Sequence, residues 1–398
     1  MQSDVTPPLA GLRVIELSSF VASPLGGMTL AQLGADVIRV DQIGGGPDID
    51  RWPLAPSGRS LYWAGLNKGK RSLTADLRSA EGRALVARLT AEAGTVLTNA
   101  PPRDGLTYEA LRELRPDLIH VQLLGTREGG NAVDYTVNAA VGLPSLTGPS
   151  GNAEPSNHVL PAWDVACGLY LAIGLLAAER HRLRTGEGTR LRVALSDVAL
   201  ATAGNLGMLA EAQLGQVRPR LGNHLFGDFG RDFATADGRV MVAVLTARHW
   251  RDLVAATGLT EVADALERAL GADFRTAGDR YTYRDALGGV LAPWFASRTS
   301  AEVEDGLKDT SVLCSRYRDL AEVAAGLHDE PIMGEIDQPG IGRHLAPASP
   351  LRLGDGAPAP VPAPELGQHT GEILRDVLGV PGEEVEALRA RGIAGEPR

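Results

Sequence analysis

The sequence predicts an α/β fold in which a parallel-sheet domain is followed by a smaller α+β segment and then by a return of the chain to the first domain. Buried strand patterns alternate with helices over the first half of the chain, and the composition changes near Gln216. At 398 residues, the chain is long enough to build two domains. We therefore assign residues 1–215 to the large domain, 216–335 to a linker and the small domain, and 336–398 to the C-terminal return.

The first structural unit is a strand, a loop, a helix and a second strand. Leu12–Leu17 and Ala35–Val40 have the apolar pattern of buried strands, and Met28–Leu33 between them has helical spacing. Such a unit implies parallel strands joined by a right-handed crossover. Its loop, S-S-F-V-A-S-P-L-G-G, lacks the glycine spacing of a dinucleotide site. Loops at the carboxyl ends of parallel strands are nevertheless candidate walls of a ligand site.

The rest of the first domain continues this alternation. A strand follows the basic segment Asn67–Asp76, and His120 is interpreted as a half-buried strand residue rather than a ligand. A long apolar helix begins near Asp164 and ends before Gly186. The remaining expected elements are helices over Ala80–Ala93 and Asp197–Leu214 and strands over Gly94–Asn99, Leu118–Leu124 and Arg190–Leu195.

The second half of the chain predicts a compact α+β segment. Residues 218–233, rich in Gly, Asn, Arg and Phe, are interpreted as an irregular linker, and Ile336–Arg343 as a loop. Two helices near the end are expected to pack back on the first domain. The predicted elements are a strand over Val240–Leu245 and helices over 249–256, 261–268, 282–297, 301–308, 370–378 and 382–390.

Composition restricts the function classes. The net charge of −10 argues against nucleic acid as a partner, so an anionic ligand would need a local basic site. Cys167 and Cys314 cannot form a disulfide framework and match no metal-binding spacing, which favours a reducing cytoplasm. The first residues lack the pattern of a signal peptide, and the apolar run Val165–Ala178 is too short to span a bilayer. We expect a cytoplasmic protein with no membrane partner.

Basic residues gather in the stretch N-K-G-K-R at 67–71 and stand at two strand ends, Arg39 and Arg103. The stretch is either a solvated basic loop or a clamp for phosphate groups. A clamp would suit an otherwise acidic protein. The residues alone leave both interpretations open.

Asp164 is the only charged residue in the stretch N-H-V-L-P-A-W-D-V-A-C-G-L-Y-L-A-I-G-L-L. Taken by itself, an Asp at the start of a helix is typical of an N-cap, and the helix dipole would keep it ionised. The alternative is a carboxylate nucleophile. The small residues 166–168 that follow would let a ligand or a neighbouring backbone approach closely.

Several segments together resemble the family III CoA-transferases. They are L-R-V-I-E-L-S-S-F-V-A-S-P-L, L-G-A-D-V-I-R-V, N-K-G-K-R-S-L-T-A-D-L, P-A-W-D-V-A-C-G and R-T-G-E-G-T-R-L-R-V-A-L-S-D. The resemblance implies a Rossmann-like large domain built from both chain ends, with a smaller α+β domain inserted between them. It further implies an interlocked homodimer, an acyl-CoA substrate and no cofactor beyond the CoA moiety, so that no metal, nicotinamide or flavin is expected.

The resemblance also assigns site residues. The family's nucleophile falls on Asp164, which would carry CoA as a thioester, and a further acidic position falls on Asp134, either as a positioning group or as the cap of a short helix. Val133 stands where the family's racemases have a histidine base, which disfavours racemisation, and Val21 replaces a polar glutamine of the first loop. The CoA-binding positions fall on Arg39, Asn67, Lys68, Lys70, Arg71, Asn99 and Arg103.

A narrower likeness within the family rests on W-A-G-L-N-K-G-K-R-S, D-Y-T-V-N, N-H-V-L-P-A-W-D, G-L-L-A-A-E-R-H-R, F-G-R-D-F and Q-P-G-I-G. It implies transfer of CoA between the C1 and C4 carboxyl groups of mesaconate within one molecule. The alternatives are a transferase that uses a separate dicarboxylic acid as acceptor and a non-catalytic CoA-binding α/β protein. An apolar wall around Asp164 is expected from Val159, Leu160, Trp163 and Val165. Arg51, His158 and Arg231 are unranked candidates for binding the distal carboxylate.

Overall fold

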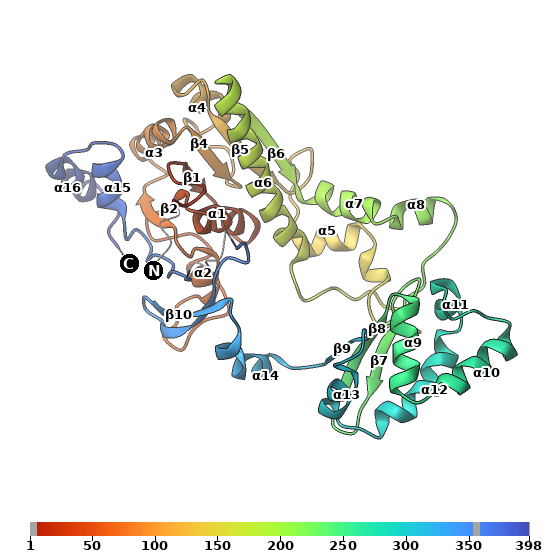
Figure 1. Cartoon of the computed structure of the whole chain (residues 1–398). Coiled ribbons are helices and arrows are strands. Elements are labelled where there is room, and N and C mark those ends of the chain that lie inside the picture. The colour runs from red at the N-terminus through yellow and green to blue at the C-terminus, as the bar shows by residue number, and fades with distance from the viewer. Residues whose placement is uncertain (1–5, 353–358, 398) are drawn as a thin grey trace. The chain divides into compact units, whose positions relative to one another are not determined.

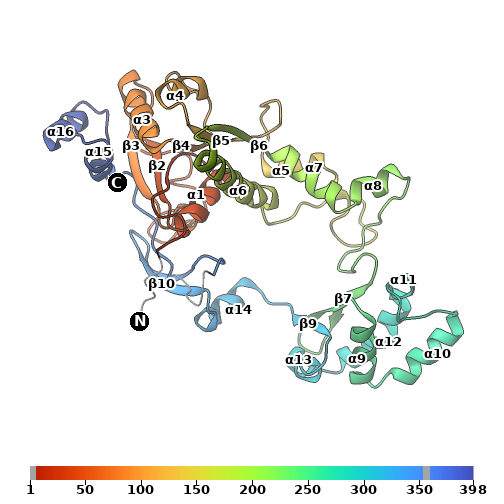
Figure 2. The same ribbon diagram turned by 45° about the horizontal axis from the view of Figure 1, so that its top comes forward.

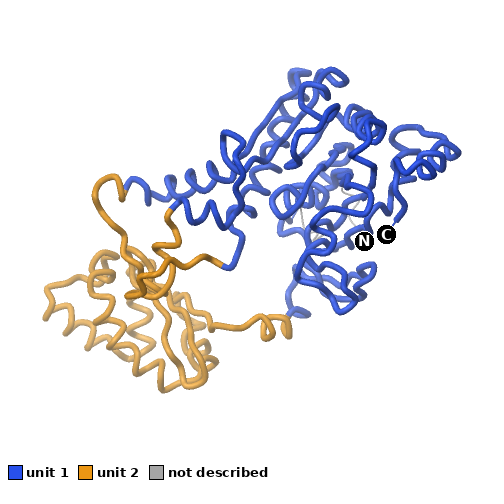
Figure 3. Tube along the Cα trace, turned by 180° about the vertical axis from the view of Figure 1, so that it is seen from behind, with its two compact units in different colours: residues 1–141, 159–210, 327–398 blue, residues 142–158, 211–326 orange. Residues whose placement is uncertain are grey.

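The computed structural model describes residues 6–352 and 359–397, and the chain divides into two compact units. Unit 1 contains residues 1–141, 159–210 and 327–398, and unit 2 contains 142–158 and 211–326 (Figure 3). The second unit is thus an insertion, and its main segment runs over 211–326 where the sequence predicted 216–335. The short segment 142–158 also belongs to it.

Unit 1 is built on a six-stranded parallel sheet with the order β3-β2-β1-β4-β5-β6 (Figure 1). This is the Rossmann order, in which the chain changes direction across the sheet between β1 and β4. The first five strands are mostly buried because helices cover both faces, so apolar residues run through much of their length. The edge strand β6 instead alternates between more and less exposed residues. The strands are β1 (Arg13–Leu17), β2 (Asp36–Gln42), β3 (Arg71–Ala75), β4 (Thr95–Thr98), β5 (Ile119–Leu124) and β6 (Thr189–Ala194).

One face of the sheet is covered by α1 (Ala22–Gln32) and α6 (Ala162–Thr185), which lie side by side (Figure 2). On the other face, α3 (Ala80–Ala93) and α4 (Tyr108–Leu114) join a core with Ile15, Leu17 and Val96. Alternate residues of one strand point to opposite faces, so Glu16, between Ile15 and Leu17, points toward α1. The remaining helices of this part are α2 (Leu61–Leu66), α5 (Asp134–Ala140) and α7 (Leu195–Asn205).

The C-terminal return completes the sheet's second face. The backbone N–H of His369 donates to Ser72 O at 2.9 Å, and that of Asp76 donates to Ile393 O at 2.9 Å, which fastens the chain end along β3. Helices α15 (Thr370–Asp376) and α16 (Gly382–Ala390) add Ile373, Leu374, Val385 and Leu388 to the core that contains α3.

The prediction of a loop over Ile336–Arg343 is wrong, since these residues belong to an antiparallel hairpin. β10 (Met333–Gln338) pairs with β11 (Gly342–Pro347), and Gly340 takes φ +70 in the turn. Prolines and glycines around the turn hide the short strands from a periodicity argument.

Unit 2 has its own core around a three-stranded antiparallel sheet, β7 (Phe229–Ala234), β8 (Arg239–Val244) and β9 (Leu313–Arg316). The predicted linker is wrong at its end, because 229–233 form β7. Phe229 and Phe233 are buried there, and Phe233 stacks on Phe295 with 4.2 Å between ring centroids. The helices are α9 (Ala247–Ala256), α10 (Thr260–Leu270), α11 (Ala277–Thr282), α12 (Arg284–Ala296), α13 (Ser300–Leu307) and α14 (Leu320–Ala325).

Two helix predictions need correction. The helix expected over Asp197–Leu214 is broken into α7 and α8 (Met208–Gln213), because Gly207 takes φ +78 between them. The apolar run Val165–Ala178 lies within α6, a helix of 24 residues. An 18-residue window of this helix has a mean hydropathy of 1.4, so by length and composition alone the helix could cross a membrane. Its packing against α1, β5 and β6 makes it the central helix of unit 1.

Candidate active site

Asp164 is the third residue of α6, and the N-cap position is taken by Pro161. The interpretation of Asp164 as an N-cap is therefore wrong. Its carboxylate makes no hydrogen bond within residues 6–352 and 359–397, while two backbone N–H groups of the same first turn are bound by another residue. The helix start is capped from outside, which leaves the Asp164 side chain available for chemistry.

The residue that caps α6 is Asp134. Its Oδ2 accepts the backbone N–H of Trp163 at 2.7 Å and that of Asp164 at 3.2 Å, and the side chain is 1% exposed. In its own helix, α5, the N-cap position is taken by Val133, whose backbone N–H donates to Thr136 Oγ1 at 3.1 Å. Asp134 therefore positions the turn that carries Asp164, and it is not the cap of its own helix.

Burial raises the pKa of Asp164 to about 6, and the negative charge of Asp134 adds to that effect, while the positive charge of Arg51 opposes it. The expectation that the helix dipole keeps Asp164 ionised is thus incomplete, because desolvation outweighs it. At neutral pH most Asp164 side chains are ionised but poorly solvated. A carboxylate in that state is a better nucleophile than one in water.

Cys167, one turn further along α6, is not a competing nucleophile. It is fully buried, and burial raises the pKa of its thiol to about 12, so little thiolate exists at neutral pH. Across the described residues, no group of His, Cys, Asp and Glu side chains could hold a metal ion.

The small residues after Asp164 let another backbone come close, and that backbone is α1. A Cβ on Gly168 would lie 2.8 Å from Ala22 O, and one on Gly26 would lie 3.0 Å from Gly168 O. The glycines therefore allow α1 and α6 to pack without a side chain between them. This contact brings the loop that precedes α1 next to the start of α6.

That loop, Ser18–Val21, is held in a strained conformation. Phe20 has φ +67, which is unusual for an aromatic residue, and its backbone N–H donates to the Asp48 carboxylate at 2.8 and 3.0 Å. Asn99 holds the neighbouring Ser19 by its backbone N–H and carbonyl, at 2.9 and 2.8 Å. The predicted site residue Asn99 thus shapes the loop through its side-chain amide.

Arg39 and Asn67 lie in a buried ion-pair network behind this loop. The Arg39 guanidinium is bound by Asp41 and Asp48, each at 2.9 Å, and it lies over the Trp63 ring at 4.4 Å. The Asn67 carbonyl oxygen accepts from Arg39 at 3.1 Å. Arg39 is 1% exposed and its guanidinium is already engaged, so it is not open to the direct CoA contact predicted for it.

Lys70 and Arg71 are likewise engaged inside the chain. The Lys70 ammonium donates to Glu16 at 2.8 Å and to Pro24 O and Asn67, both at 2.9 Å, which uses all of its protons. Arg71 joins Asp36 to Glu372, at 3.0 Å from the latter, and so ties β2 and β3 to α15. The stretch 67–71 is therefore neither a solvated loop nor, at these positions, an open phosphate clamp.

Lys68 differs from its neighbours. It is 5% exposed, burial lowers the pKa of its ammonium, and no ion pair joins it to a described residue. Of the basic stretch, Lys68 remains the candidate for a ligand's phosphate.

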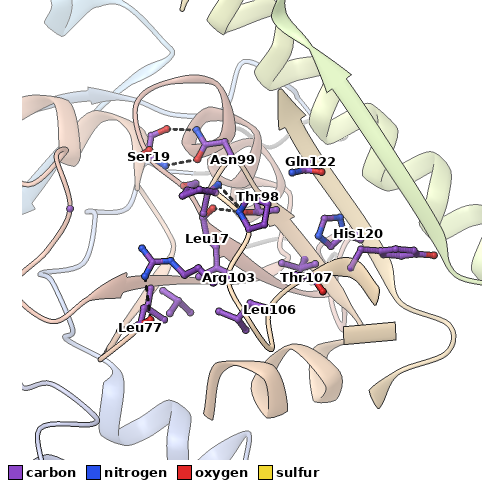
Figure 4. A pocket seen from close by; sticks show the side chains of 18 of the residues that line it. Leu17, Ser19, Leu77, Thr98, Asn99, Arg103, Leu106, Thr107, His120 and Gln122 are labelled. Atoms are coloured by element: carbon purple, nitrogen blue, oxygen red, sulfur yellow. Dashed lines mark hydrogen bonds between the residues drawn. The ribbon is translucent and has the colours of Figure 1, made fainter. Parts of the chain in front are cut away.

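A cavity of about 320 Å³ opens at the point where the strand order reverses, between the ends of β1 and β4 (Figure 4). Ligands of open α/β sheets bind at this place. Asn99 and Arg103 line it, and Arg103 donates to Leu77 O at 3.2 Å. His120 also lines it and is 4% exposed, and burial lowers the pKa of its imidazole to about 4, so it is neutral there. His120 was interpreted from the sequence as a half-buried strand residue; it does stand in β5, but it is buried and lines the cavity.

Comparison with known proteins identifies the family. The sequence profile of CoA-transferase family III matches residues 9–370. The chain belongs to CoA-transferase family III. A relative from Chloroflexus aurantiacus, 2-methylfumaryl-CoA isomerase, is 50% identical over 401 residues that cover 98% of each chain.

More distant relatives share the family. A succinyl-CoA:mesaconate CoA-transferase from Haloarcula hispanica is 31% identical, over 94% of this chain and 96% of that one. The crystal structure of a CAIB/BAIF family protein from Brucella suis superimposes with a TM-score of 0.78 at 28% identity, covering 93% of this chain and 99% of that chain.

The wall expected around the family III nucleophile is not built as predicted. Val159 and Leu160 are 94% and 59% exposed, so they do not shield Asp164 in this chain. Trp163 is buried and donates its indole N–H to Asn138 at 3.2 Å, beneath the first turn of α6. Residues other than Val159 and Leu160 therefore bury Asp164.

The ion pair between Lys70 and Glu16 leads to a prediction about stability. Lys70→Met leaves Glu16 fully buried without its cation, so we expect a loss of about 3–5 kcal/mol in the free energy of unfolding by urea. Lys68→Met is the matched control. It should leave the unfolding free energy nearly unchanged and raise KM for the CoA ester. An unaltered unfolding curve for Lys70→Met would contradict the structural role.

Proposed function

We propose that this enzyme moves CoA between the C1 and C4 carboxyl groups of mesaconate, converting mesaconyl-C1-CoA into mesaconyl-C4-CoA without a second substrate. Its support is the relative that is 50% identical over 98% of the chain. The observation that carries the chemistry is the pair Asp164 and Asp134: one carboxylate caps the helix start, and the other is left free and partly desolvated beside it.

The reaction begins with attack of an Asp164 carboxylate oxygen on the C1 thioester carbonyl. The C–S bond breaks, and CoA leaves as a thiolate, giving a mixed anhydride of Asp164 and mesaconate. The thiolate then attacks the Asp164 carbonyl carbon, and the C–O bond to mesaconate breaks. The result is an Asp164–CoA thioester and mesaconate with both carboxylates free.

The second half repeats these steps at the other end of mesaconate. The C4 carboxylate attacks the Asp164 thioester, and CoA leaves again as a thiolate. The thiolate attacks the C4 carbonyl of the new anhydride, which releases mesaconyl-C4-CoA and restores the Asp164 carboxylate. No proton is gained or lost over the cycle, so no general base is needed, which agrees with Val133 at the position of the racemase histidine.

The fold offers CoA a place next to this carboxylate. The cavity at the β1–β4 switch point would hold the nucleotide, with Asn99 and Arg103 as contacts from its lining. Lys68 does not line this cavity and would bind a phosphate of CoA outside it. Arg39, Asn67, Lys70 and Arg71 would act indirectly, by fixing the loop and strand ends. We further propose a cytoplasmic, interlocked homodimer that needs no cofactor beyond the CoA moiety of its substrate.

The second candidate is transfer to a separate dicarboxylic acid, as the name of the 31% identical Haloarcula relative describes. Incubation of the purified enzyme with mesaconyl-C1-CoA alone separates the two functions. We expect the C4 regioisomer to accumulate, and labelled free mesaconate added during turnover to enter the product poorly. Rapid equilibration with the label would favour the intermolecular transferase.

The same incubation tests the covalent step. Hydroxylamine added during turnover should inactivate the enzyme, and peptide mass mapping should find a hydroxamate at Asp164. An enzyme that neither isomerises the ester nor becomes labelled would be a CoA-binding protein without this activity.

A further inference from the structure

Arg51 is held firmly in the segment between β2 and α2. Its backbone N–H donates to Asp48 O at 3.3 Å, and its carbonyl accepts from Ser60 Oγ at 2.6 Å. The guanidinium carbon lies over the Phe20 ring at 5.1 Å and over the Tyr62 ring at 4.6 Å. Two aromatic rings therefore fix the guanidinium, by an attraction that uses its π face and leaves its N–H edge unoccupied.

The N–H groups of Arg51 have no acceptor in the described part of the chain. Neither an ion pair nor a side-chain hydrogen bond joins Arg51 to a residue in 6–352 or 359–397. Arg39 and Arg71 of the same unit are both bound by carboxylates. A half-buried guanidinium that is held by rings and not paired with an acid is suited to a carboxylate that arrives with a ligand.

Arg51 lies near the start of α6, because it is held over the ring of Phe20 in the loop before α1. The first residue of α1, Ala22, lies against Gly168, one turn after Asp164. The positive charge of Arg51 lowers the pKa of Asp164 against the effect of burial, and the charges of both residues act on the Tyr62 hydroxyl. A carboxylate bound by Arg51 would therefore lie near the carbonyl carbon that Asp164 attacks.

Asp48 joins this arrangement to the strained loop. Its side chain accepts the backbone N–H of Phe20, and its carbonyl accepts that of Arg51. The residue thus fixes both the ring and the cation that lies over it. The left-handed backbone of Phe20, at φ +67, is the cost of placing that ring.

We propose that Arg51 binds the free carboxylate of a dicarboxylic acyl-CoA substrate and so selects for substrates that carry one. The proposal rests on the function proposed above and names the residue that recognises the substrate's free carboxylate. With mesaconyl-C1-CoA, Arg51 pairs with the C4 carboxylate, and with the C4 ester it pairs with the C1 carboxylate.

This role also explains how mesaconate is retained in the site while Asp164 carries CoA as a thioester. When Asp164 is a thioester it carries no charge, and the released mesaconate has two carboxylates. Arg51 can hold one of them in a bidentate pair while the other attacks the thioester. Exchange of the two carboxylates at this one cation is all that the isomerisation requires.

The test measures binding in a background that cannot react. In Asp164→Asn, titration calorimetry gives the Kd for mesaconyl-C1-CoA and for crotonyl-CoA, which lacks the distal carboxylate. Adding Arg51→Met should raise the Kd for mesaconyl-C1-CoA by about 10- to 100-fold and change the Kd for crotonyl-CoA by less than about threefold. Arg51→Lys keeps the charge without the planar guanidinium, so its Kd for mesaconyl-C1-CoA should lie between the values for the arginine and methionine forms. Because no turnover is needed, this result stands even if the wild-type enzyme does not isomerise mesaconyl-CoA.

The matched control is Arg59→Met, which removes the same charge from a side chain that is 41% exposed and 3.9 Å from Glu365. It should change neither Kd. Equal weakening of both esters by Arg51→Met would overturn the proposal, because the residue would then serve the fold or the CoA moiety. An unchanged preference for the mesaconyl ester would overturn it as well. In the active background, Arg51→Met should also let labelled mesaconate enter the product.

Discussion

Asp164→Asn should reduce isomerisation of mesaconyl-C1-CoA by about 10³-fold or more and at the same time stabilise the protein. The amide keeps the shape of the carboxylate but is a far weaker nucleophile, so the covalent route is lost. The regioisomers can be separated chromatographically to measure the rate. Retained CoA affinity would show that the site itself is intact.

The gain in stability follows from the direction of the pKa shift. Asp164 has a pKa of about 6 in the folded chain against an ordinary value of 3.8, so the folded state binds its proton more tightly than the unfolded state. Stability from this group is therefore present below about pH 4 and is lost as the pH rises to 6. At neutral pH the carboxylate costs roughly 1–3 kcal/mol, which the neutral amide removes.

Thermal melting at pH 7 tests this, with Asp285→Asn as the control. Asp285 stands in the first turn of α12 with a side chain that is 81% exposed, so its removal should not raise the melting temperature. A melting temperature lowered by Asp164→Asn, or an active variant, would contradict the view of Asp164 as a desolvated nucleophile.

The strands of the six-stranded parallel sheet could be predicted because burial on both faces gives most of them short apolar runs that need no partner to be recognised. β7 and β10 were missed for the opposite reason. Glycine and charged residues interrupt both strands, and only pairing with β8 and β11 makes them strands. Local sequence carries little of that pairing information.

Asp164 was proposed as the nucleophile from the family resemblance, because its own surroundings were typical of a helix cap. The residues that support it could not be predicted. Lys70 is buried because Glu16 stands 54 positions earlier in the chain. The one available sign was a glutamate inside the apolar run R-V-I-E-L, since a buried acid requires a cation. The sequence shows the cation and the acid, but only the fold shows that they meet.

Asp134→Asn should shift the acid limb of the pH profile of kcat/KM to lower pH. In the wild type, attack requires the Asp164 carboxylate, whose pKa is about 6, so kcat/KM should fall about tenfold for each pH unit below that value. Removing the charge of Asp134 removes one of the two causes that raise this pKa. The limb should still lie above the ordinary value of 3.8, because burial, the larger cause, remains.

Asp134→Ala separates charge from capping. It leaves the backbone N–H groups of Trp163 and Asp164 without their acceptor, at a cost of about 2–4 kcal/mol in the free energy of unfolding. The asparagine variant keeps an oxygen that can accept these bonds and should lose less. If both variants shift the acid limb equally but only the alanine variant loses kcat, then the charge sets the pKa and the hydrogen bonds set the position of the nucleophile. An acid limb that stays at pH 6 in both would show that burial alone raises the pKa of Asp164 and that Asp134 acts only on the helix.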